Sequence, residues 1–199
     1  MSAPVIAARR VLHPGRSPAD RVLGAVVPRP RRALVWLPEG RTLYDALVGA
    51  FGRFGVRAGV LQLFGGELSA AVYHTANPDP DSPRAVEYGP PIQLDGGTRL
   101  VRATGSYGED LAGRPLVHLH GVLAEPDGRP HGGHLAPDRC VVGRSGVRAL
   151  LLLSVGFKQA VDPETRFSIF FPFAEVGSHG SVDRAGDPYG PRRQRPSWT

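Results

Sequence analysis

The chain has 199 residues, 26 glycines, 20 prolines, one cysteine and a formal net charge of +6. A lone cysteine cannot close an internal disulfide, so the sequence gives no support for a secreted, bridge-stabilised fold. The longest apolar run, Ala149 to Val155, is far shorter than the roughly 20 residues of a membrane-spanning helix. No signal-peptide pattern opens the chain. We therefore expect a cytoplasmic protein with no membrane span.

Positive charge is concentrated at the two ends of the chain. Residues 1–32 contain seven arginines and one acid, and residues 176–199 contain four arginines and two acids. The stretch between them, 33–175, has a net charge of −2. We predict an arginine-rich N-terminal arm over 1–32, one folded domain over 33–175 and a disordered C-terminal tail over 176–199. Any affinity for phosphates should then lie in the arms.

The first elements in chain order are a strand over 33–37 and a helix over 42–54. Apolar residues in the helix recur every three or four positions, which forms one apolar stripe. Thr42 and Asp45 have the spacing of an N-terminal capping pair, and Gly55 suits the left-handed residue that ends a helix. These signals predict one strong helix early in the chain.

The rest of the chain has the pattern of strands. We predict strands over 56–64 and 68–74, joined by a tight hairpin at Gly65-Gly66, and then a polar, proline-rich loop over 77–91. Further strands are expected over 98–106, 116–123, around His134, over 147–155 and over 167–171. One helix among many strands predicts an α+β fold, with a largely antiparallel sheet and the helix packed on one face, rather than repeated βαβ units.

The segment PLVHLHGVLAEPDGRPHGGHL, residues 115–135, carries the most informative pattern. His118 and His120 are two residues apart on a predicted strand, so they share a face at roughly 6.6–7 Å. If the following turn is a three-residue loop centred on Asp127, His134 lies directly opposite His120. Three imidazoles with one open position are the ligand set of a zinc site that keeps a water or accepts a substrate, although other divalent transition metals also suit nitrogen ligands.

Other readings of this segment stay open. A two-residue loop would place His134 on the opposite face unless Gly132-Gly133 forms a bulge, and these glycines also suit a close approach to a bound group. His131 has the wrong parity for the same face and is expected to be a loop or surface residue. His74 is expected at a solvent-exposed strand end, with a role beside the metal ligands as the alternative. Each histidine, taken alone, is more often structural than ligating.

GRPLVHLHGVLAEPDGRPHGGHL resembles the plants-and-prokaryotes-conserved (PPC) domain, also called domain of unknown function 296. Upstream, FGVRAGVLQLFGGELSAAVYH and LVRATGSYGED are similar to the same family. The resemblance covers roughly residues 33–175. It implies an antiparallel sheet with flanking helices, a homotrimer, and a metal held by His118, His120 and His134.

Plant members of this family carry AT-hooks, which is why bacterial relatives are labelled DNA-binding. This chain has Gly-Arg-Pro at 113–115 and at 128–130, but neither has the flanking basic residues of a hook. The DNA-binding expectation for this chain therefore rests on the arms.

Three functions follow from the sequence. The preferred one is a metal-binding PPC-domain protein with a tris-histidine, zinc-type site and an unidentified cellular role. The first alternative is non-specific DNA association through the arginine-rich arms. The second is a zinc-dependent enzyme acting on a small molecule bound at the metal, with Glu67, Glu87 and Glu109 as the acids within reach and with no catalytic residue assigned.

Overall fold

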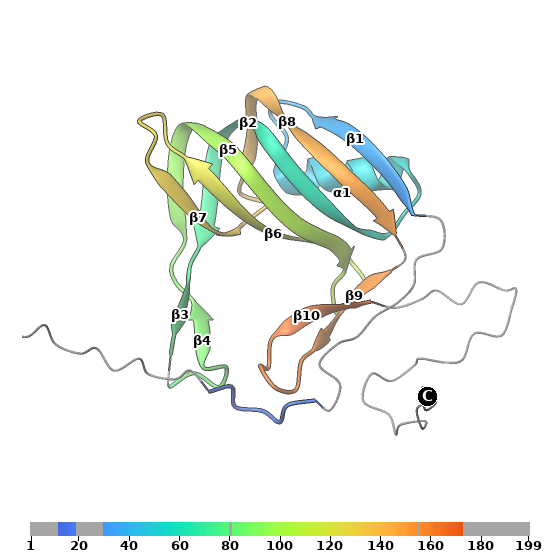
Figure 1. Cartoon of the computed structure of the whole chain (residues 1–199), viewed down its shortest axis with the longest axis vertical. Helices are drawn as coiled ribbons and strands as arrows, with labels where there is room; N and C mark the ends of the chain where they lie inside the picture. Colours follow the sequence, from blue (N-terminus) through green and yellow to red (C-terminus); the bar gives the residue numbers. More distant parts are fainter. Residues whose placement is uncertain (1–11, 19–29, 80, 155, 173–199) are drawn as a thin grey trace, which may run out of the picture.

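The computed structural model describes residues 12–18, 30–79, 81–154 and 156–172 (Figure 1). They form a mostly antiparallel β-structure with one short helix, as the predicted fold class requires. The elements are, in chain order, β1 (Arg31–Leu37), α1 (Leu43–Arg53), β2 (Ala58–His74), β3 (Ala76–Pro78), β4 (Val86–Tyr88), β5 (Ile92–Glu109), β6 (Pro115–Ala124), β7 (Pro130–Leu135), β8 (Val141–Ser154), β9 (Phe157–Val161) and β10 (Ser168–Pro172).

Helix α1 begins and ends where the sequence predicts. The Thr42 hydroxyl accepts a hydrogen bond from the backbone N–H of Asp45 at 3.0 Å, which caps the first turn. Gly55, with φ of +65°, follows the last turn. The apolar stripe of the helix is buried, and the Phe51 ring stacks on Tyr107 of β5 at 4.3 Å between centroids. Helix α1 therefore covers one face of the sheet, which we call the inner face.

Strand β2 corrects the prediction of a hairpin at Gly65-Gly66. The chain continues as a single strand through these residues, although both have positive φ, +68° and +118°. Strand β2 pairs with β5 along one edge and with β8 along the other, and the β8 register shifts on either side of Gly66. The two glycines form a bulge, because positive φ serves a bulge as well as a tight turn.

The strands on one side of the sheet form a closed ring. Strand β2 pairs with β5, β5 with β6, β6 with β7, and β7 returns to the end of β2 through Tyr73↔Leu135 and His74↔His134. Strand β8 pairs with β2 along the edge opposite β5, and β1 continues the sheet beyond β8 (Figure 1). Strand β6 thus has a partner on each side, which holds its side chains in fixed alternation between the inner and outer faces.

Two small hairpins project from this sheet (Figure 1). Strand β4 and all of β3 except Ala76 lie within the stretch predicted as a loop over 77–91. The two strands pair from Ala76↔Tyr88 to Pro78↔Val86, so this prediction was wrong. Strands β9 and β10 form the second hairpin. The contacts of Tyr88 and Arg84 with the Phe167 ring join the two hairpins.

The predicted arms lie largely outside the described residues. Of the arm over 1–32 the structure describes 12–18 and 30–32, and it describes none of the tail over 176–199. Within the described ranges, no helix has the length and apolar character needed to cross a membrane.

Candidate metal centre

Strand β6 presents His118 and His120 on the outer face of the sheet. Val117 and Leu119 alternate with them and are buried in the core on the inner face. His118 is partly buried and His120 is exposed. The strand sequence thus separates apolar core residues from imidazoles by parity alone, as predicted.

The turn between β6 and β7 sets the position of the third histidine. The backbone N–H of Glu125 donates to the Arg129 carbonyl at 2.9 Å, and Gly128 has φ of +87°. The loop is therefore the predicted three-residue loop centred on Asp127. The register through β6 and β7 is uninterrupted, and it pairs His120 directly with His134. The predicted register is confirmed.

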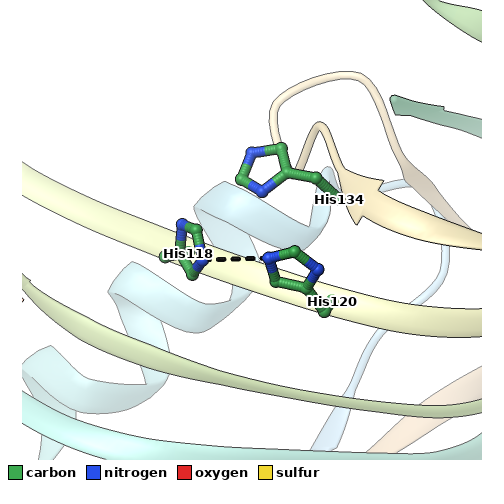
Figure 2. Close-up of side chains that lie close together, drawn as sticks. All are labelled: His118, His120 and His134. Carbon is green, nitrogen blue, oxygen red and sulfur yellow. Dashed lines mark hydrogen bonds between the residues drawn. The ribbon is translucent and has the colours of Figure 1, made fainter. Parts of the chain in front are cut away.

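The three side chains converge on one point of the outer face (Figure 2). Nε2 of His120 lies 3.1 Å from Nε2 of His118, and one ring nitrogen from each of the three histidines lies within 4.8 Å of the others. Metal–nitrogen bonds of about 2.0–2.1 Å in a tetrahedron imply nitrogens about 3.4 Å apart. A small contraction of the cluster would therefore bring all three nitrogens to bonding distance of one ion.

Electrostatics keep the imidazoles available as ligands. Burial, followed by the nearby His118, His120 and His74 rings, lowers the pKa of His134 to about 4. Burial and His120 lower the pKa of His118 as well. Both rings are thus neutral at pH 7, which is the form that binds metals.

One atom of the cluster has an unmet requirement. Nδ1 of His134 is buried and has no hydrogen-bond partner among the described residues. A buried polar atom without a partner costs roughly 1–3 kcal/mol, so such atoms are uncommon. A partner supplied by a bound species would remove this cost. The donor set, three nitrogens without a carboxylate, suits zinc and other divalent transition metals rather than calcium or magnesium.

The glycines before His134 form no bulge, and Gly133 has a structural role that the sequence did not predict. The β6–β7 register contains no bulge at Gly132-Gly133. A Cβ on Gly133 would lie 2.3 Å from the His74 carbonyl oxygen and 3.0 Å from Cδ2 of the Tyr73 ring. Gly133 therefore allows a close approach to the backbone of β2, which lets β7 reach β2.

His74 lies beside the cluster rather than at a free strand end. It pairs with His134 in the β2–β7 register and is partly buried. Its Nδ1 lies 2.9 Å from the Gly89 carbonyl, which can only accept, so Nδ1 carries the proton. The sequence could not separate this position from an exposed one, because the β2–β7 contact joins residues 60 positions apart.

His131 is a structural residue of the inner side, and the expectation of a loop or surface residue was wrong. It lies in β7, where its Nδ1 is 2.9 Å from the Tyr73 hydroxyl and its Nε2 is 2.6 Å from Oε1 of Glu125. A carboxylate accepts, so Nε2–H donates to Glu125, and in the neutral ring Nδ1 accepts from Tyr73. We call Tyr73, His131 and Glu125 the inner chain.

None of the three acids proposed for an enzyme is brought into the histidine cluster. Glu109 forms an ion pair with Arg57 at 2.6 Å, and Glu87 is held by Arg84 and by the Ser82 hydroxyl. Those contacts with Ser82 and Arg84 lower the pKa of Glu87. Glu67 lies against Gly143 of β8. None of the three carboxylates is among the described residues that the structure groups as possible metal ligands.

The two Gly-Arg-Pro segments do not present free arginines. Arg114 pairs with Asp110 at 2.9 Å, and Arg129 pairs with Asp127 at 3.1 Å. Both arginines therefore close the turns on which they lie.

The matching family model is the Plants and Prokaryotes Conserved (PCC) domain, over residues 27–147. The chain belongs to this family. The resemblance found in the sequence is thereby confirmed, and the matched range contains the whole histidine cluster. No curated protein matches the chain.

Solved structures share the fold of this PCC protein. A metal-containing protein from Archaeoglobus fulgidus is 20% identical, with a TM-score of 0.60, and the match covers 76% of this chain and 99% of that one. A PPC protein from Pyrococcus horikoshii is also 20% identical, with a TM-score of 0.57 and coverage of 77% and 99%. A protein from Ralstonia eutropha, described as a candidate DNA binder, is 21% identical, with a TM-score of 0.56 and coverage of 69% and 89%.

Proposed function

We propose that this PCC-domain protein binds one divalent transition metal, zinc by availability, through His118, His120 and His134. The observation that carries the proposal is the convergence of one nitrogen from each ring within 4.8 Å on the outer face. Neutral rings and a buried ring nitrogen without a partner support it. The similar protein of Archaeoglobus fulgidus is described as metal-containing, which agrees with the same reading.

The metal would keep an open position for a ligand. Three protein nitrogens leave a four-coordinate ion with one free site, and His120 is exposed to solvent. Such an ion would supply Lewis acidity and would lower the pKa of bound water. The ion pairs of Glu87 and Glu109 favour a ligand-binding role over an enzyme, because neither carboxylate is free to transfer a proton.

We also propose that the chain forms a homotrimer. The family resemblance supplies the number, and the surface supplies a reason for association. The outer face of β1 and β8 carries exposed apolar side chains, with Leu34 at 69% and Trp36 at 61% exposure. Exposed apolar patches of this kind mark interaction surfaces.

DNA association is the weaker alternative. Solved structures similar to this chain include proteins described as candidate DNA binders. In this chain, however, both Gly-Arg-Pro arginines are ion-paired, and the arms lie largely outside the described residues. No contact among the described residues favours DNA over the metal site.

Native mass spectrometry of protein without a histidine tag tests the metal and the trimer in one measurement. We expect three chains and close to one zinc per chain in the wild type. His120→Ala should lose the zinc, because two imidazoles bind a metal far more weakly than three. His13→Ala, which removes a histidine outside the cluster, should keep it. Wild-type protein that stays metal-free after zinc is supplied would refute the metal site, and a single-chain mass would refute the trimer.

A further inference from the structure

A shallow depression of about 290 Å³ adjoins the histidine cluster on the outer face. Three strands line it: β5 with Arg102 and Thr104, β6 with His120, Gly121 and Val122, and β7 with Gly133. Since His120 belongs both to the cluster and to this lining, a ligand in the depression would meet the proposed metal at its exposed side.

Strand pairing brings Arg102 and Thr104 to this position. Thr104 pairs with His120 across β5 and β6, and Arg102 lies two residues earlier on β5, opposite Val122. Residues two apart on a strand share a face, and diagonal neighbours on adjacent strands lie roughly 7–8 Å apart. The guanidinium and the hydroxyl are thus placed on the same face as the three imidazoles.

Among the described residues, no carboxylate neutralises the charge of Arg102. Its Nη2 donates to Oε1 of Gln62 at 3.1 Å, an amide oxygen that orients the guanidinium without cancelling its charge. No carboxylate of the described residues lies within ion-pair distance of Arg102, whereas Arg57, Arg84, Arg114 and Arg129 each have one. No acidic residue lines the depression.

We propose that the depression is a subsite for a small oxoanion, of the carboxylate or phosphate class. One oxygen of the anion would take the open position at the metal, and the others would accept hydrogen bonds from Arg102 and Thr104. This inference rests on the proposed metal centre. It follows from charge: a divalent ion held by three imidazoles without a carboxylate, a guanidinium and a hydroxyl donor favour a negatively charged, oxygen-rich ligand.

Cobalt(II) provides a direct test, because its visible absorption changes when a ligand enters its coordination sphere. The full-length protein is loaded with one equivalent of cobalt and titrated with inorganic phosphate. We expect a saturable spectral change in the wild type. Arg102→Gln should keep the cobalt stoichiometry and raise the apparent Kd for phosphate about tenfold or more, since a charge-assisted hydrogen bond contributes at least that factor.

Arg148→Gln is the matched control. Arg148 lies on the same outer face, with its guanidinium carbon 5.4 Å from the centre of the Phe64 ring, but it does not line the depression. Its loss removes the same charge from the same face without removing a group that lines the depression. Its effect on phosphate affinity should therefore be about twofold or less at physiological salt, which screens exposed charges outside the site.

The possible outcomes distinguish the anion subsite from the metal centre. Normal cobalt binding with a phosphate affinity that Arg102→Gln leaves unchanged would overturn the subsite and leave the metal centre intact. Equal losses in Arg102→Gln and Arg148→Gln would overturn it as well, because the anion would then respond to the charge of the whole face. A cobalt spectrum that responds to duplex DNA and not to phosphate would overturn the assignment to a small anion. Failure to bind cobalt at all would refute the metal centre, and the subsite with it.

Discussion

The β6–β7 hairpin carries histidines on both of its faces, and the two faces differ in how their rings are satisfied. On the inner side, His131 has a partner for each nitrogen, Tyr73 at 2.9 Å and Glu125 at 2.6 Å. On the outer side, His118 and His120 face each other, and a buried nitrogen of His134 has no partner among the described residues. An imidazole whose two nitrogens are both hydrogen-bonded stabilises the fold. Imidazoles that converge and lack hydrogen-bond partners indicate a binding site.

The two faces therefore predict different consequences of mutation, a loss of stability on the inner side and a loss of metal on the outer side. Disrupting the inner chain should lower stability and leave the ligand set in place. Disrupting the outer cluster should remove the metal with little effect on the fold, because His120 is exposed. One residue, Gly133, lies where both faces depend on it, because β7 there touches the backbone of β2.

The largest effect is expected for Gly133→Ala, which should damage both faces together. The new Cβ would lie 2.3 Å from the His74 carbonyl oxygen, so β7 must move away from β2. Overpacking of this kind costs about 1–3 kcal/mol. We expect a loss near the upper end of this range by urea denaturation, and weaker zinc binding because His134 moves with the strand.

Gly49→Ala is the control for this substitution. Gly49 is exposed on α1, and a Cβ there meets nothing within 4 Å. Alanine in a helix is favoured over glycine by about 1 kcal/mol, so stability should rise slightly and zinc binding should not change. A Gly133→Ala protein as stable as the wild type would show that β7 does not need its close contact with β2.

An intermediate effect is expected for Tyr73→Phe, which breaks the inner chain alone. The Tyr73 side chain is 5% exposed, so its loss leaves Nδ1 of His131 without a donor in a nearly dry environment. We expect the free energy of unfolding to fall by about 1–2 kcal/mol, with zinc affinity within about threefold of the wild type. Tyr44→Phe, which removes an exposed hydrogen bond to the Pro115 carbonyl, should cost less. Loss of zinc without loss of stability in Tyr73→Phe would assign the inner chain to the metal site instead.

A further effect is a pH dependence that belongs to the outer cluster. In the metal-free protein the pKa of His134 is lowered from 6.5 to about 4. Between these values the unfolded chain binds a proton that the folded chain does not, so the free energy of unfolding falls as pH drops from 6.5 towards 4. Urea midpoints of metal-free protein at pH 7 and pH 5 should show this fall, and His134→Gln should reduce it. An identical pH slope in the two proteins would contradict the depressed pKa.

The hairpin and the helix could be predicted because their information is local. Pro126, Asp127 and Gly128 specify the loop that places His134 opposite His120, and Thr42 and Gly55 mark the limits of α1. Local signals of this kind lie within a few residues of the structure that they determine. The family resemblance also rests on local information, because it is carried by continuous segments of the sequence.

The remaining features depend on pairings between distant segments. Gly65 and Gly66 suit a turn or a bulge equally, and the choice is made by β5 and β8, which pair with β2 on both sides. His74 meets His134 only because the strand ring closes between β2 and β7. Arg102 was not associated with the histidines either. The loop between β5 and β6 has the same backbone hydrogen bonds as the β6–β7 loop and sets the register that pairs Thr104 with His120, but Arg102 belongs to no motif that would mark it as part of the site.

The spacing of the cluster along the chain also affects how the protein folds. His118 and His134 belong to one hairpin, whereas the pairing of β1 with β8 joins Arg31 to Leu153. Isolated hairpins form in about 1–10 μs, and the entropy lost on closing a loop grows with its length. The ligand nitrogens can therefore assemble before the rest of the sheet is complete. A metal ion present at that stage would bind a partly folded chain and favour the strand register of the native protein.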